Sequence, residues 1–198
     1  MTRVRRTNAD RAQATRQALM AAGRRLFADQ GFQATGTPQI VAEAGLTRGA
    51  LYHHFEDKTA LFAAIVEAEQ AAVAAHIKAA SAVEGDLVDQ LIAGGEGFMA
   101  AMAEPGRRRI LLVDGPAVLG RERLEAGEAA HARRTLDEGL TLAMEAGVLR
   151  RLPVRELSDL LGALFDRAAL MAADDDRAAW RAALAGVLEG LRAEARSG

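Results

Sequence analysis

The chain has 198 residues, of which 50% are hydrophobic, 26% charged and 4% aromatic, and none is cysteine. The lack of cysteine excludes disulfides, thiolate metal sites and cysteine catalysis. We find no run of about 18 uncharged apolar residues, which a membrane span requires. The basic start, MTRVRR, has no apolar block behind it. Abundant alanine and leucine favour helix, so we expect a cytoplasmic, all-α protein without membrane association.

The net charge of −2 conceals an uneven distribution. Residues 1–60 contain nine Lys/Arg and five Asp/Glu, a balance of +4, whereas residues 61–198 contain 16 and 22, a balance of −6. This asymmetry indicates either that the first part faces a polyanion or that its charges only maintain solubility. Residues 1–9 form a basic arm, which either enters a DNA minor groove or is a plain tail.

Capping residues divide the start of the chain into short helices. With Asp10 as N-cap, apolar residues spaced three and four apart predict a helix over about 10–30 that ends at Gly31. A second helix begins near Thr35 or Thr37, where Pro38 fits the first helical position. These segments supply the first two helices of a compact N-terminal module.

The third helix is the most informative segment. Thr47 caps a helix over about 48–55, in which Leu51 and Phe55 are four residues apart and share the inward face. Basic, small and polar-tipped aromatic residues then share the outward face. Two short helices joined by a turn that contains glycine predict a helix-turn-helix.

Long helices are predicted for the rest of the chain. One runs over about 58–79 and links two modules, and the chain should hold about nine helices in total. The remaining segments are about 86–103, 105–119, 121–146, 155–173 and 174–194.

The first 62 residues resemble the tetracycline-repressor (TetR) family of transcriptional regulators. The run GLTRGALYHHF at 45–55 and Lys58 three residues later carry the resemblance, together with ADQGF at 28–32. The segment LVDGPAVLG at 112–120 also resembles ligand domains of some members. Thr37, Pro38 and Val41 depart from the residues usual in the family's second helix.

The resemblance implies a homodimeric repressor that a small molecule releases from a palindromic operator on double-stranded DNA. Residues 1–57 would form the helix-turn-helix DNA-binding domain, and residues 58–198 the ligand-binding and dimerisation domain. Arg48 would read a base and Lys58 would contact phosphate. The full set of DNA-binding positions expected from the match is Thr35, Thr37, Gln39, Thr47, Arg48, Gly49, Tyr52, His53 and Lys58.

Two further sites are expected in the second domain. Phe98, Met99 and Met102 share a helix face and either line an apolar cavity or pack as core; His131 and Phe165 complete the candidate pocket. Apolar stripes on the last two helices would pair with their symmetry mates in a four-helix dimer interface. The stripes consist of Leu157, Leu160, Leu161, Leu164, Trp180, Leu184, Val187, Leu188 and Leu191.

Catalytic signatures are not found in the sequence, so we expect neither an enzyme nor a bound metal or cofactor. Two alternatives stay open. The chain is either a helical enzyme that acts on a small molecule in the C-terminal cavity, or a ligand-independent architectural DNA-binding protein.

Overall fold

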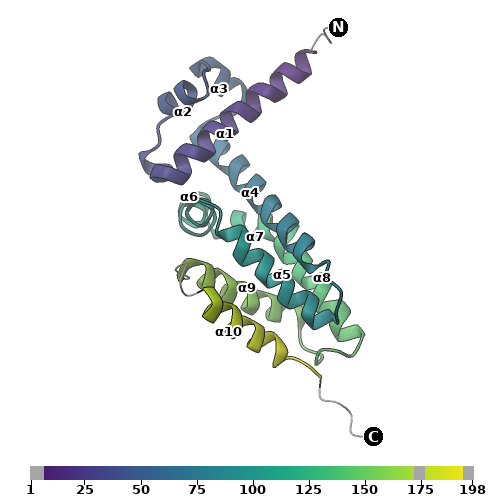
Figure 1. The fold of residues 1–198 in the computed structure, drawn as a ribbon. Helices are drawn as coiled ribbons and strands as arrows, with labels where there is room; N and C mark the ends of the chain where they lie inside the picture. The colour runs from purple at the N-terminus through teal and green to yellow at the C-terminus, as the bar shows by residue number, and fades with distance from the viewer. Residues whose placement is uncertain (1–6, 172–176, 194–198) are drawn as a thin grey trace, which may run out of the picture.

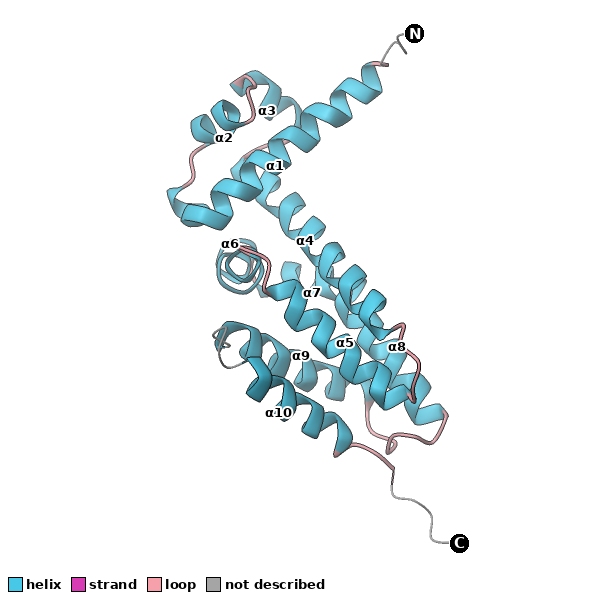
Figure 2. Cartoon of the chain, in the orientation of Figure 1, coloured by secondary structure: helices cyan, strands magenta, loops and turns pink. Residues whose placement is uncertain are grey.

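The computed structural model describes residues 7–171 and 177–193. In that part of the chain the fold is all-α (Figures 1 and 2), and the only β feature is an isolated bridge between Leu149 and Arg192. The α-helices are α1 (Asn8–Ala34), α2 (Thr37–Glu43), α3 (Arg48–His54), α4 (Lys58–Ser81), α5 (Leu87–Met102), α6 (Gly115–Leu119), α7 (Arg121–Ala130), α8 (Ala132–Glu145), α9 (Val154–Met171) and α10 (Arg177–Glu189), and a π-helix, η1 (Arg109–Asp114), precedes α6.

The molecule is elongated (Figure 1). Helices α1–α3 form a small module at one end, and α4 runs from this module into the larger helical body, where α5 lies alongside it. Two glycines allow the close approach of α5 to α4. A Cβ at Gly97 would lie 2.6 Å from the Cβ of Ala80, and one at Gly94 would lie 2.6 Å from the Ser81 hydroxyl oxygen.

Helix α1 differs from the prediction at its start. Thr7 is the N-cap: its hydroxyl accepts from the Asp10 N–H, while the Asp10 carboxylate accepts from the Thr7 N–H. The predicted cap, Asp10, is therefore the third helical residue of a capping box. The predicted break at Gly31 is confirmed, because Gly31 has a φ of +83° and interrupts the helix. A short segment continues to Ala34 beyond this kink.

Two of the predicted long helices are each divided in the structure. Over 105–119 a π-helix precedes α6, and the Gly115 N–H donates five residues back to the Ile110 carbonyl. Pro116 has no N–H to donate and crowds the preceding turn, which explains why a regular α-helix does not continue here. Over 121–146 the helix is broken at His131, whose φ of −125° and ψ of −99° are not helical.

The apolar residues form two cores. In the first, Phe27, Phe32 and Phe62 have ring centroids 5.0–5.7 Å apart, and fully buried residues from α2 and α3 pack beside them. The same cluster extends to Ile110 of η1, so the N-terminal module shares its core with the helical body. The second core lies between α5, α8, α9 and α10 and includes Leu140 and Leu161.

Helix α4 is long and apolar enough for a membrane span by length and composition, with a mean hydropathy of 1.4 over its most apolar window. That window contains glutamate, and 44% of it is buried inside the protein. Eight α4 residues, Glu69 and Gln70 among them, are buried against other helices. The position of α4 in this structure is therefore that of a core helix.

Candidate nucleic-acid interface and internal cavity

Helix α3 has one buried and one exposed face. The Thr47 hydroxyl caps it by accepting from the Ala50 N–H at 3.2 Å. Leu51 is fully buried and Phe55 is 4% exposed, so these two side chains fix the helix on the first core, as the sequence predicted. The opposite face exposes Arg48, Gly49, Tyr52 and His53 to solvent, with Thr47 exposed at the helix start.

Arg48 and Tyr52 support one another on the exposed face. A guanidinium nitrogen of Arg48 lies 3.5 Å from the Tyr52 hydroxyl oxygen, and its Cζ is 5.5 Å from the centre of the ring. The Arg48 guanidinium lowers the pKa of Tyr52, and the hydroxyl of Thr37 on α2 lowers it further. This contact partly orders a long cationic side chain at the point where the helix is most open to a ligand.

Helix α2 begins differently from the prediction. Its N-cap is Gly36, and Pro38 occupies the second helical position. The side chain of Gln39 caps the helix by accepting from the Gly36 N–H at 2.7 Å, and it also accepts from Gln30 at 3.5 Å. Gln39 is exposed and Thr37 half-buried, so both lie on the surface beside α3.

Thr35, one of the expected DNA-binding residues, has a buried side chain. The side chain is 1% exposed, and its hydroxyl donates to the Gly31 carbonyl at 2.7 Å. Gln30 donates to the same hydroxyl at 3.3 Å. This burial argues against the phosphate contact expected for the Thr35 side chain, because its hydroxyl already bonds a carbonyl left free by the kink in α1.

Lys58 is likewise engaged within the protein. Its ammonium donates to the carbonyls of Phe32 and Thr35 at 2.8 and 2.9 Å, and it lies 4.0 Å from the centre of the Phe32 ring. These are carbonyls at the end of α1, where a cation is favourable. The structure thus gives Lys58 contacts that position α4 against α1, and these compete with the phosphate contact expected from the sequence.

A buried ion-pair network joins α1 to α4. Glu69 on α4 accepts from Arg24 of α1 at 2.8 and 3.2 Å and from Arg107 at 2.7 Å. Arg107 also donates to the Ala101 carbonyl at 2.8 Å. Burial alone would raise the pKa of Glu69, but the hydrogen bonds from the two arginines outweigh it and lower this pKa. Sequence reasoning missed the network, since its three members are 38 and 45 residues apart.

The end of α1 is also tied to η1. The Asp114 carboxylate accepts from the Phe32 N–H at 2.9 Å, directly after the Gly31 kink, and Arg109 donates to the Asp29 carbonyl at 2.9 Å. Just before η1, Gly106 packs so tightly on α1 that an added Cβ would lie 2.1 Å from the Cβ of Ala28. The N-terminal module is therefore joined to the body by polar contacts as well as by its shared core.

The helical body contains a partly open cavity of about 990 Å³, which α4, α5, η1, α8 and α9 chiefly line. Of the predicted pocket residues, Phe98, Met102 and Phe165 lie on its wall. Met99 instead lines a smaller neighbouring cavity of about 200 Å³ between α5 and α10. His131 is outside the set of lining residues, because it sits at the break between α7 and α8.

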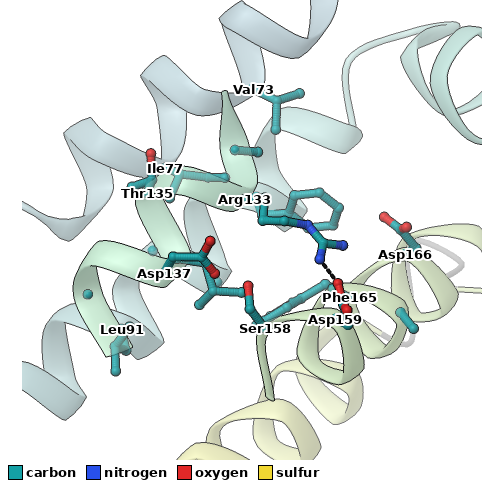
Figure 3. Close-up of a pocket in the computed structure, with 18 of the residues that line it drawn as sticks. Val73, Ile77, Leu91, Arg133, Thr135, Asp137, Ser158, Asp159, Phe165 and Asp166 are labelled. Atoms are coloured by element: carbon teal, nitrogen blue, oxygen red, sulfur yellow. Dashed lines mark ion pairs between the residues drawn. The ribbon is translucent and has the colours of Figure 1, made fainter. Parts of the chain in front are cut away.

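Polar groups gather on the α8–α9 side of the cavity (Figure 3). Asp137 and Ser158 approach it from the two helices, and Arg133 pairs with Asp159 across them. Burial raises the pKa of Asp166 to about 6, against the opposing effect of Arg133. None of these residues was singled out from the sequence, because the apolar walls around them come from helices distant in the chain.

The predicted dimer residues divide into two groups. Leu161, Leu184 and Leu188 are between 2% and 9% exposed in the second core, and Leu157, Trp180 and Leu191 pack against it. These side chains pack within the core of a single chain. The exposed members are Leu160 at 66%, Leu164 at 44% and Val187 at 42%. They leave an apolar surface on α9 and α10, helices that lie together along one edge of the body (Figure 1).

Among the described residues, no group of three or more His, Asp or Glu side chains is placed to hold a metal ion. His53 and His54 lie next to each other with ring centroids 5.2 Å apart. They form a ring contact on the surface of α3.

Comparisons with known proteins give sequence matches to curated regulators over part of the chain. The transcriptional regulator AcrR of Shigella flexneri is 48% identical over 56 residues, which are 28% of this chain and 26% of AcrR. The transcriptional repressor BepR of Brucella suis is 41% identical over 63 residues, 32% of this chain and 30% of BepR. The chain thus spans under a third of the length of these two curated relatives.

Structural similarity covers almost the whole chain. A tetR-family transcriptional regulator from Pectobacterium atrosepticum is 30% identical with a TM-score of 0.74, and the match covers 96% of this chain and 100% of that one. Escherichia coli NemR in its reduced form has the same fold at 21% identity, with a TM-score of 0.73 and coverage of 91% and 99%.

Two family models match the chain. The model for bacterial regulatory proteins of the tetR family matches residues 19–65, and the model for tetracyclin repressor-like C-terminal domains matches residues 88–193. The second match alone spans more than half of the chain. AcrR, BepR and the Pectobacterium atrosepticum protein are named as regulators of transcription rather than as enzymes. With a DNA-binding helix-turn-helix in front of this C-terminal domain, the chain belongs to the tetR family of bacterial transcriptional regulators.

Proposed function

We propose that the protein is a homodimeric repressor that binds a palindromic operator in the cytoplasm and leaves it when a small molecule enters the cavity. The observation that carries the DNA-binding part is the exposed face of α3, where Arg48, Tyr52 and His53 face solvent while Leu51 and Phe55 anchor the helix. The name of BepR, a transcriptional repressor, supports repression as the direction of control.

Arg48 is the residue we propose for base recognition. A guanidinium can bond both major-groove acceptors of guanine, which discriminates against other bases by about 1–3 kcal/mol. Tyr52 and His53 lie on the same face and fit contacts to the phosphate backbone, which set register rather than sequence. Gly49 leaves open space beside them, since a Cβ there would meet only the Thr47 hydroxyl, at 3.9 Å.

The DNA-binding proposal is tested by selecting bound sequences from random duplexes with the wild-type protein and with Arg48→Ala. We expect the wild type to select an inverted repeat and Arg48→Ala to lose about 1–3 kcal/mol of preference at one position of each half-site. Arg134→Ala is the matched control, because Arg134 is an exposed arginine on α8. Equal affinity for random and selected duplexes would favour an architectural DNA-binding protein instead.

We propose that the exposed apolar surface of α9 and α10, formed by Leu160, Leu164 and Val187, is the dimer interface. A twofold axis there would present two copies of α3 to successive major grooves, about 34–36 Å apart, on a palindromic site. Sedimentation of Leu160→Asp should give a monomer with greatly weakened operator binding. Val83→Asp is the control, since Val83 is similarly exposed, at 43%, in the α4–α5 connection. A dimeric Leu160→Asp would place the interface elsewhere.

A further inference from the structure

We propose that the effector of this protein is an amphipathic organic cation, with an apolar body in the large cavity and a protonated amine held between Asp137 and Ser158. This inference names the ligand class for the cavity and so rests on the proposed effector-controlled repressor. It is carried by two buried oxygen atoms that the protein leaves without partners.

Ser158 is 1% exposed, and its hydroxyl oxygen has no hydrogen-bond partner among the described residues. The Oδ1 atom of Asp137, a half-buried residue, is also buried and has no hydrogen-bond partner among the described residues. A buried polar atom without a partner is costly, and such atoms are rare in folded proteins. Both residues line the cavity, where Figure 3 shows them approaching the same space from α8 and α9. A ligand that donates hydrogen bonds at this point would satisfy both oxygens at once.

The charges around this point favour a cation. Arg133 is already paired with the Asp159 carboxylate, and Arg155, the other basic lining residue, is exposed. Asp137 and Asp166 are the acidic lining residues outside that pair. The raised pKa of Asp166, about 6, indicates that its charge is poorly solvated here. An ammonium group would stabilise these carboxylates, whereas a carboxylate ligand would be repelled by them.

The remainder of the wall is apolar and fits the body of such a ligand. Val73 and Ile77 of α4, Phe98 of α5 and Leu111 of η1 line it, and the volume of about 990 Å³ is at the upper end of the range for drug-sized ligands. Transfer of a hydrocarbon body from water would supply most of the affinity, at roughly 0.8 kcal/mol per buried CH₂. The polar pair would supply selectivity among head groups.

The test uses three probes with one hydrocarbon tail and different heads: decylammonium, decanol and decanoate, each kept below its micelle-forming concentration. Binding to the purified full-length protein is measured by calorimetry without DNA. We expect decylammonium to bind at least about tenfold more tightly than the other two, as one charge-assisted hydrogen bond provides. Preference for decanoate, equal affinity for the three heads, or binding of none of them would overturn the assignment.

Two variants locate the head group. Asp137→Asn should weaken decylammonium about tenfold or more while changing decanol less than twofold; Glu138→Gln, an exposed acid next to it on α8, should change neither. Ser158→Ala should also weaken decylammonium, with no fall in melting temperature, because it removes an unpartnered hydroxyl. If Asp137→Asn and Glu138→Gln have the same effect, the head group lies elsewhere.

Operator binding by the ligand-free protein is measured separately. If the protein selects an operator but fails the head-group test, the ligand class is wrong and the repressor proposal stands. If it selects no operator, the proposed function fails, whatever the calorimetry shows.

Discussion

Glu69→Gln is the substitution from which we expect the largest effect on stability. It keeps the size of the side chain but removes the negative charge shared by Arg24 and Arg107. The Arg107 side chain is 8% exposed, so its charge would be left buried without a counter-ion, which typically costs about 3–5 kcal/mol. Arg24 is 27% exposed and screened by water, so its part adds less than about 1 kcal/mol. Domains are commonly stable by only about 5–15 kcal/mol, so this loss is large.

Urea unfolding followed by circular dichroism measures this loss. We expect a lower midpoint with an unchanged slope at pH 7. Because the pKa of Glu69 is lowered in the folded protein, its contribution is present above the unfolded value of 4.5 and is lost as the pH falls through the folded value. The difference between wild type and variant should therefore shrink below about pH 4.

The matched control is Glu67→Gln, which removes an exposed carboxylate two residues away on the same helix. We expect a change within about 0.5 kcal/mol, as for most surface substitutions. A loss below about 1 kcal/mol for Glu69→Gln, or a loss that does not depend on pH, would show that this network does not hold α1 on α4.

Two further predictions concern ionisable groups. Lys58→Met should lower the free energy of unfolding by about 1.5–3 kcal/mol, because the Lys58 ammonium donates hydrogen bonds to two carbonyls at the end of α1. The same substitution should leave the salt dependence of DNA binding unchanged. If instead the salt slope falls by about one unit and the stability does not change, Lys58 contacts a DNA phosphate. Asp166→Asn should stabilise the protein by about 3 kcal/mol at pH 7.5 and by about 1 kcal/mol at pH 4.5. The reason is that the pKa of Asp166 is raised from 3.8 to about 6 in the folded protein, so ionising this acid destabilises the fold increasingly as the pH rises from 3.8 to about 6. Melting curves of both proteins at the two pH values measure it, and equal differences would contradict it.

The sequence predicted α3 correctly because the features that define this helix are local. A capping threonine, two inward residues four apart and polar residues between them are all contained in one short segment, and the structure has Leu51 and Phe55 buried there. The break at Gly31 was predictable for the same reason, since only its own backbone conformation decides it.

Other features depend on contacts between segments that are distant in the sequence. Thr35 and Lys58 look like DNA contacts in the sequence, and only the fold shows that carbonyls at the end of α1 bond both side chains. Leu161 and Leu188 follow helical apolar stripes, but periodicity shows that a face is buried and not what covers it. The cavity acids Asp137 and Asp166 escaped notice because their environment is created by helices far away in the sequence.

The arrangement of contacts also indicates how a ligand in the cavity would reach the DNA-binding module. On α4, Gln70 lines the cavity while its neighbour Glu69 bonds Arg24 of α1. On η1, Leu112 lines the cavity while Asp114, two residues on, bonds the Phe32 N–H of α1. Each pair lies on one helical turn, so a ligand that displaces the cavity side would also move the contact with α1. We infer that both routes act on the C-terminal half of α1, one at Arg24 and the other at Phe32. In the proposed dimer, a coupling of about 1–3 kcal/mol, typical between two sites, would then require only a small change in the angle between the two copies of α3.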